Sequence, residues 1–111
     1  MLRLCIQVAT AAATLIFSTQ ALSALDDAAA SPMLSKGGCR ACHAVDKKMV
    51  GPSYQDVAKK YKGDAKAVAM LSEKVRKGST GTWGQVPMPP TPPDRISDAD
   101  LKAVLEWILT K

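Results

Sequence analysis

The chain has few aromatic side chains and only one histidine. Its 111 residues include one Phe, two Trp, two Tyr and one His. A small domain with so few large rings usually depends on a disulfide, a metal or a cofactor for its stability. With one histidine and one closely spaced pair of cysteines, the chain cannot supply the four ligands of a structural zinc site. Something other than side chains is therefore expected to fill the centre.

The sequence also lacks a hydrophobic run long enough to span a membrane. The apolar stretch from Leu4 to Phe17 is shorter than the ~20 residues that a spanning helix needs. It follows Arg3 and precedes small residues that offer cleavage sites ending at Ser23 or Ala24. This order is typical of a secretory signal peptide. We expect residues 1–24 to be cleaved and residues 25–111 to form one domain in the periplasm, without a stable membrane anchor.

Basic residues exceed acidic ones, but they form no nucleic-acid motif. The formal net charge is +5, and loss of Arg3 with the signal peptide lowers it to +4. The excess is spread along the chain, with no aromatic residues interleaved along a basic stripe. No nucleic-acid partner is expected. A basic rim that steers an acidic protein partner is compatible with this distribution.

Two cysteines and the single histidine form the pentapeptide Cys39-Arg40-Ala41-Cys42-His43. C-x-x-C-H is the sequence signature of c-type haem attachment. At about 100° per residue on a helix, Cys42 and His43 lie about 60° and about 40° to either side of Cys39. The three side chains therefore share one face. Two thiols can reach the haem vinyl groups while the imidazole meets the iron.

Three other uses of the cysteines compete with haem attachment. Cys39 and Cys42 could form a disulfide in an oxidising compartment. A thioredoxin-like redox pair would need a βαβ context, but no strand-like run surrounds the motif. A structural zinc site would need further ligands that the chain does not contain. The pentapeptide together with the export signal favours one covalently bound haem c with its iron.

Met88 lies in a proline-rich loop and is the expected sixth ligand of the iron. Five prolines between Gly81 and Pro93 exclude a helix, and Pro87 and Pro89 hold Met88 extended. A rigid loop suits a weak thioether ligand, and His/Met ligation closes both axial positions and raises the reduction potential. The alternative is a gap-filling core methionine. That role is expected of the other methionines of the domain: Met33, Met49 and Met70.

Hydrophobic spacing and capping residues predict short helices and no convincing strand. Ser31-Pro32 predicts a helix start, Ser53 and Ser97 are expected N-caps, and Asp64 is expected to cap a helix that Gly78 ends. The expected helical segments are 31–36, 53–61, 64–77 and 97–109, in addition to the cysteine motif. In the last segment, apolar residues recur at the spacing of one buried face, with Trp107 beside it as a core residue. The prediction is an all-α domain of four to five short helices.

Several spaced motifs resemble those of cytochrome c-551, the short bacterial class I cytochrome c. The matching runs are 38–44, 49–52, 78–79, 83–84 and 87–90, so the resemblance covers essentially all of residues 25–111. It implies the class I cytochrome c fold, in which short helices and long loops wrap around one covalent haem. It also implies a monomer, with Cys39 and Cys42 as thioethers and His43 and Met88 as axial ligands.

The same resemblance assigns further roles around the haem. It implies that the Pro52 carbonyl receives the other imidazole N–H of His43, a contact that fixes a ligand's orientation. It places the Trp83 indole N–H on a haem propionate, with Lys74 near the same group. Family members often have an asparagine three residues after the axial methionine, hydrogen-bonded to its sulfur. This chain has Thr91 there.

The expected function is that of an electron carrier rather than an enzyme. A haem peroxidase needs an open iron position and distal acid/base groups, whereas the one histidine and Met88 would occupy both axial positions. A sensing module would need an extra domain, which the sequence does not show. The resemblance implies redox partners such as a bc1-type complex as donor and nitrite reductase or a terminal oxidase as acceptor. Lys36, Arg40, Lys47 and Lys48 lie within or beside the haem motif, and some of them are expected to ring the exposed haem edge and steer an acidic partner. The alternative is that these cations only keep the protein soluble, while a small apolar patch around the haem edge makes the contact.

Overall fold

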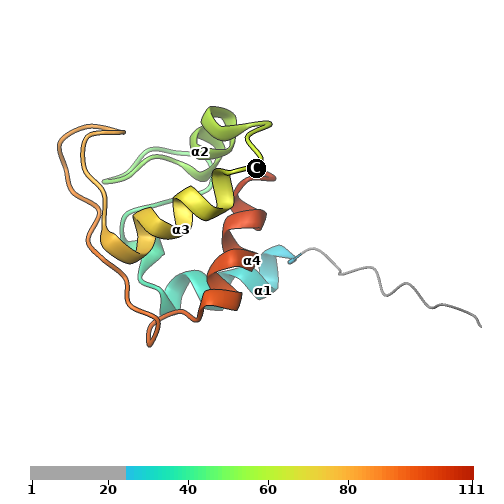
Figure 1. Cartoon of the computed structure of the whole chain (residues 1–111). Coiled ribbons are helices and arrows are strands. Elements are labelled where there is room, and N and C mark those ends of the chain that lie inside the picture. The colour runs from blue at the N-terminus through green and yellow to red at the C-terminus, as the bar shows by residue number, and fades with distance from the viewer. Residues whose placement is uncertain (1–24) are drawn as a thin grey trace, which may run out of the picture.

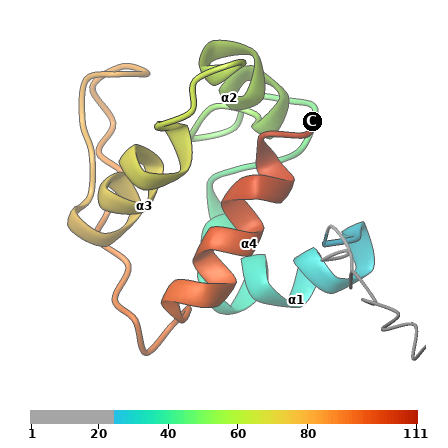
Figure 2. The same ribbon diagram turned by 45° about the vertical axis from the view of Figure 1, so that its right-hand side comes forward.

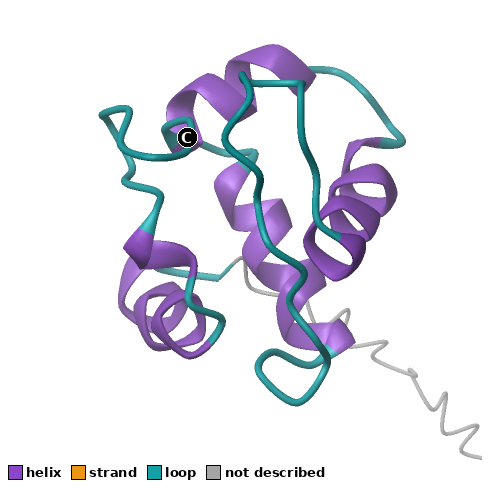
Figure 3. Cartoon of the chain, turned by 90° about the vertical axis from the view of Figure 1, so that its left-hand side faces the viewer, coloured by secondary structure: helices purple, strands orange, loops and turns teal. Residues whose placement is uncertain are grey.

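The computed structural model describes residues 25–111, so the expected signal peptide, residues 1–24, lies outside the described residues. The helices are α1 (Asp27–Lys36), the short 3-10 helix η1 (Cys39–Ala41), α2 (Tyr54–Tyr61), α3 (Ala67–Lys77) and α4 (Asp98–Ile108) (Figure 1). Residues 25–111 contain no strand, and their one β-type pairing is an isolated antiparallel bridge between Ser79 and Met88 (Figure 3). The predicted all-α class is confirmed.

Side-chain N-caps explain where three helices begin. The Asp26 carboxylate accepts a hydrogen bond from the amide of Ala29 at 2.7 Å. The hydroxyls of Ser53 and Ser97 accept from amides three residues ahead, at 3.0 and 3.2 Å. Each cap gives a partner to an amide that the first helical turn leaves free. The predicted caps at Ser53 and Ser97 are therefore confirmed.

Two predicted helix starts are wrong. The first helix begins at Asp27, and Pro32 lies inside it rather than at its first position. The Asp26 cap and the strong helix propensity of the alanines after Asp27 start this helix upstream of the proline. The third helix begins at Ala67 instead of near Asp64. Asp64 forms a turn, in which its carboxylate accepts from the Lys66 amide at 2.8 Å.

Helix α4 is the central element of the core. It packs against α1, α2 and α3, and Figure 2 shows it running between α1 and the α2–α3 pair. Its buried residues are Leu101, Val104, Leu105, Trp107 and Ile108, so the predicted apolar face and the core role of Trp107 are confirmed. The helices are joined by long loops, chiefly residues 42–53 and 78–97. None of the helices in residues 25–111 is long and apolar enough to cross a membrane.

Candidate functional site

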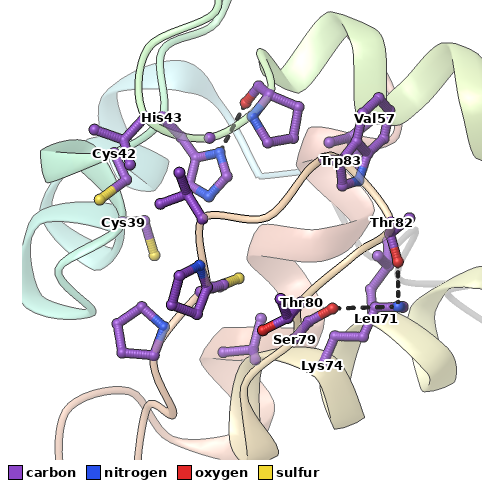
Figure 4. A pocket seen from close by; sticks show the side chains of 18 of the residues that line it. Cys39, Cys42, His43, Val57, Leu71, Lys74, Ser79, Thr80, Thr82 and Trp83 are labelled. Carbon is purple, nitrogen blue, oxygen red and sulfur yellow. Dashed lines mark hydrogen bonds between the residues drawn. The ribbon is translucent and has the colours of Figure 1, made fainter.

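A cavity of about 570 Å³ lies between the helices and the two long loops. Its walls include apolar side chains of α2, α3 and α4, and Figure 4 shows Val57 and Leu71 among them (Figure 4). Volumes of this order are usual for sites that bind a small organic ligand or cofactor. The apolar residues that line it on these helices are Val57, Leu71, Val75, Leu101, Val104, Leu105 and Ile108.

The cysteine motif brings three side chains to this cavity. Cys39 begins the 3-10 helix, and the amides of Cys42 and His43 both donate to the Cys39 carbonyl, at 3.2 and 3.0 Å. The turn is tighter than the α-helix assumed from the spacing. All three side chains nevertheless line the cavity (Figure 4). The two sulfur atoms and the imidazole are thus available to one bound group.

The imidazole of His43 is held by the loop that follows it. Its Nδ1 lies 2.7 Å from the carbonyl oxygen of Pro52. A carbonyl oxygen can only accept, so Nδ1 carries the proton, and in the neutral ring Nε2 keeps its lone pair. Nε2 is therefore the ring nitrogen that can bind a metal ion, and the Pro52 contact fixes the ring's tautomer.

Two further residues confine the His43 ring. The Gly51 amide donates to the Cys42 carbonyl at 2.8 Å. A Cβ atom at Gly51 would lie 2.5 Å from His43 Cε1 and within 3.0 Å of both ring nitrogens, so any other residue here would displace the ring. The ring of Tyr54 stacks on the imidazole with a centroid distance of 5.7 Å. Its hydroxyl is buried with no hydrogen-bond partner among the described residues, and burial raises the pKa of Tyr54.

Met88 reaches the same cavity from the loop between α3 and α4. Its amide donates to the Ser79 carbonyl at 2.8 Å, and the Ser79 amide donates to the Met88 carbonyl at 3.1 Å. These two bonds close a hairpin whose tip is held by a bond from the Gly81 amide to the Gly84 carbonyl at 2.9 Å. The position of Met88 is therefore set by pairing with Ser79 as well as by the flanking prolines.

Two of the other expected site residues line the cavity, Trp83 from the tip of this hairpin and Lys74 from α3. Trp83 lines the cavity and is 41% exposed. Lys74 of α3 also lines it, and its ammonium donates to the hydroxyl of Thr82 at 3.0 Å and to that of Ser79 at 3.4 Å (Figure 4). Lys74 and Trp83 thus lie at one cavity, where an anionic group could meet them.

Thr91 and most of the flanking cations lie elsewhere. Thr91 is buried but is not among the residues that line the cavity. Of the four cations considered for the haem edge, Lys48 lines the cavity and Lys36 and Lys47 do not. Arg40 lies at a second cavity of about 420 Å³ and donates to the Ser31 hydroxyl at 2.6 Å.

The structure does not favour the competing uses of the cysteines. Cys39 and Cys42 are not joined in a disulfide. Burial raises the pKa of Cys39, which disfavours the thiolate that a reactive redox dithiol needs. Within residues 25–111, no three His, Cys, Asp or Glu side chains are grouped so that they could hold a metal ion. Two thiols, one imidazole nitrogen and one thioether around an apolar cavity fit a covalently attached haem.

Some features of the site have no signal in the sequence. Ser79 pairs with Met88 through backbone groups alone, and no alternation of side chains marks this pairing. Tyr54 follows a predicted helix cap directly, which places it in the first turn of α2, but nothing in the sequence indicates stacking on His43. The predicted core role of Met49 is wrong, because Met49 is 44% exposed and lines the cavity.

Comparisons with known proteins agree on one family. The family model described as Cytochrome c matches residues 28–111. A cytochrome c2 of Rubrivivax gelatinosus is 60% identical over 77 residues, which is 69% of this chain and 91% of that protein. A cytochrome c-551 of Allochromatium vinosum is 50% identical over 91 residues, or 82% of this chain and 92% of that protein.

Solved structures give the same result for the fold. The wild-type cytochrome c552 of Nitrosomonas europaea is 45% identical, with a TM-score of 0.64 over 72% of this chain and 96% of that one. The class 1 cytochrome MtoD of Sideroxydans lithotrophicus is 33% identical, with a TM-score of 0.65 over 78% of this chain and 97% of that one.

Proposed function

This chain belongs to the cytochrome c family and is a monohaem electron carrier of the short class I type, and we propose that it passes single electrons between protein partners in the periplasm. When bound, the haem c supplies an iron that gains and loses one electron. We assign its two thioether bonds to Cys39 and Cys42 and its two axial positions to His43 and Met88. Removal of residues 1–24 on export belongs to the same proposal.

The observation that carries this assignment is the orientation of His43. Its Nδ1–H donates to the Pro52 carbonyl at 2.7 Å, which leaves Nε2 as the ring nitrogen able to bind iron. Both cysteines of the motif line the cavity that His43 lines, and Met88 lines it too. Four side chains from two separate segments of the chain therefore offer the two thiols and the two axial ligands that one haem c requires. Trp83 and Lys74 are the residues that we assign to a haem propionate.

Electron transfer without other chemistry follows from what the cavity contains. Among residues 25–111, its lining includes one imidazole and no Asp or Glu. If His43 and Met88 both bind the iron, no coordination position stays open, and no carboxylate is at hand to move protons. A neutral thioether opposite the imidazole favours the ferrous state, so we expect a raised reduction potential.

We propose that the protein partner docks where the cavity opens to the surface. Four exposed apolar side chains line the cavity: Met49, Val50, Trp83 and Val86. Lys48 and Lys74 line it as well, and Lys47 lies next to Lys48 in the sequence. An apolar contact flanked by cations suits a redox protein with an acidic patch, whose approach would be steered by charge. We propose a bc1-type complex as donor and nitrite reductase or a terminal oxidase as acceptor, as the family resemblance implies.

The axial assignment is tested by spectroscopy of the holoprotein with and without carbon monoxide. We expect a sulfur-to-iron charge-transfer band in the oxidised parent and little carbon monoxide binding in the reduced parent. Met88→Ala should lose the band, bind carbon monoxide and have a lower reduction potential. The matched control is Met49→Ala, which removes another methionine from the same cavity. If Met49→Ala opens the iron and Met88→Ala does not, the assignment is wrong.

The docking site is tested by the rate of electron transfer to an acceptor at increasing ionic strength. We expect the rate to fall as salt shortens the Debye length to about 10 Å at 0.1 M. Lys47→Glu with Lys48→Glu should slow the reaction, whereas Lys102→Glu, on an exposed position of α4 outside the cavity lining, should not. A rate that is flat in salt and equal in all three proteins would show that the apolar contact, and not charge, governs docking.

A further inference from the structure

Arg76 joins the end of α3 to two later segments of the chain, the loop after Met88 and the start of α4. It lies near the end of α3, and its side chain is only 18% exposed. Its guanidinium donates to the Thr91 carbonyl at 3.2 Å, to the Ile96 carbonyl at 2.8 Å and to the Asp98 carboxylate at 2.6 Å. The end of α3, the loop after Met88 and the first turn of α4 are thus joined by one side chain.

The contact with Thr91 is part of a double anchor. The Thr91 amide donates to the Val75 carbonyl at 2.8 Å, next to Arg76 in the sequence. Both backbone groups of Thr91 are therefore bound to the last turns of α3. Because Thr91 is buried, its carbonyl has little access to water, and loss of the Arg76 donor would leave it unpaired.

Met88 is consequently held on both sides by the same end of one helix. On the upstream side, Ser79 lies two residues beyond α3 and pairs with Met88 through two backbone hydrogen bonds. On the downstream side, Pro89 and Pro90 give the chain little freedom before it reaches Thr91. The thioether has no polar atom beyond its sulfur, so its position depends on these backbone anchors.

We propose that Arg76 is a positioning residue that keeps the Met88 sulfur on the iron. The inference rests on the proposed axial role of Met88 and concerns how firmly that ligand is held. Arginine is suited to this role because its planar fork reaches two carbonyls and a carboxylate at once, whereas a lysine ammonium on a flexible stem cannot. Without the fork, the loop that carries Met88 should move away from the cavity more often.

The test is the rate at which imidazole replaces Met88 on the oxidised holoprotein. At imidazole concentrations where release of the sulfur limits the rate, Arg76→Lys should accelerate exchange about tenfold, the factor expected when the contribution of about one hydrogen bond is lost. The sulfur-to-iron band should weaken in parallel. The matched control is Lys77→Gln at the next position, whose exposed side chain pairs only with Glu73 among the described residues; it should leave the rate unchanged.

A second variant separates anchoring from general loss of stability. Asp98→Ala removes the ion pair but leaves both carbonyls bound to Arg76, so its exchange rate should stay near that of the parent even if its unfolding temperature falls. Equal acceleration in Asp98→Ala and Arg76→Lys would overturn the inference, as would a parent-like rate in Arg76→Lys. The axial assignment fails separately, if Met88→Ala binds imidazole no faster than the parent.

Discussion

Gly78 is the position at which a single methyl group should disturb the Met88 loop most. Gly78 follows α3 directly and has φ 81° and ψ 167°, a conformation that is essentially confined to glycine. A Cβ atom there would lie 2.8 Å from the Met88 carbonyl oxygen and 3.2 Å from Pro90 Cδ. These are backbone and ring atoms, which cannot rotate away. Gly78→Ala must therefore change either the end of α3 or the Ser79–Met88 pairing.

The expected loss of unfolding free energy in Gly78→Ala combines two effects. The backbone conformation alone should cost an alanine about 2 kcal/mol. Weakening of the two Ser79–Met88 hydrogen bonds adds up to about 1 kcal/mol each. The sum is about 3–4 kcal/mol, a large part of the stability of a domain of this size. For such a domain, each 1 kcal/mol lowers Tm by roughly 4–8 °C, so Tm should fall by more than about 12 °C.

The assay is thermal and denaturant unfolding of the oxidised holoprotein, followed both by circular dichroism and by the sulfur-to-iron band. Gly81→Ala is the matched control, because Gly81 has φ 98° in the same loop but no described atom within 4 Å of the place that a Cβ atom would take. Gly81→Ala should lose only the unfolding free energy that is due to the strained backbone conformation of an alanine. Equal losses in the two variants would refute the steric argument, and an unchanged band in Gly78→Ala would refute the idea that the pairing holds Met88.

Three further predictions concern other parts of the chain. Gly51→Ala should push the imidazole of His43 away from the Pro52 carbonyl. It should lower the unfolding free energy by about 1–3 kcal/mol and also lower the reduction potential. An unchanged potential in voltammetry would contradict this. The pKa of Asp27 is lowered by hydrogen bonds, chiefly from the Lys111 ammonium and to a smaller extent from the Trp107 indole. Because the pKa of Asp27 is lower in the folded state, the charged carboxylate stabilises the fold above the unfolded-state pKa near 3.8, and this stability is lost as pH falls through the folded-state pKa. Asp27→Asn should therefore have a lower free energy of unfolding than the parent at about pH 6. In urea unfolding, the difference between the two proteins should vanish under strong acid. Mass spectrometry of the exported holoprotein should give a chain that begins after Ser23 or Ala24 and carries one haem; a retained leader would contradict the proposed cleavage.

The sequence predicts those parts of the fold whose signals are local. The apolar spacing of α4 and the serine caps at Ser53 and Ser97 depend on residues within a few positions of one another, and the structure confirms them. The predicted start of α1 is wrong because a proline after a serine resembles a helix start, whereas the cap at Asp26 and the alanines after Asp27 already provide one. Where two capping signals lie within a few residues of each other, the packing of the folded chain determines which of them starts the helix, and the local sequence does not show this packing.

The sequence could not reveal contacts between segments that are distant along the chain. Arg76 contacts Thr91 and Ile96, 15 and 20 residues away, through carbonyl groups that every residue has. Neither contact depends on the identity of the residue that accepts, so no motif marks it. The exposure of Met49 is a related case. Its place at the cavity follows from the route of the loop before α2, which residue type alone does not determine.

The two sides of the cavity are held in different ways, and the difference follows from the chemistry of the two proposed ligands. An imidazole has two nitrogens, so His43 can be oriented through Nδ1 by a carbonyl only nine residues away and still leave Nε2 for the proposed bond to iron. The Met88 side chain has one sulfur and no second polar atom, so it can be oriented only through its backbone. The chain meets this need by pairing Met88 with Ser79 and by binding Thr91 to the end of α3. It follows that substitutions in the last turn of α3, residues 74–77, should change exchange of the proposed Met88 ligand, although only Lys74 and Val75 of this turn line the cavity.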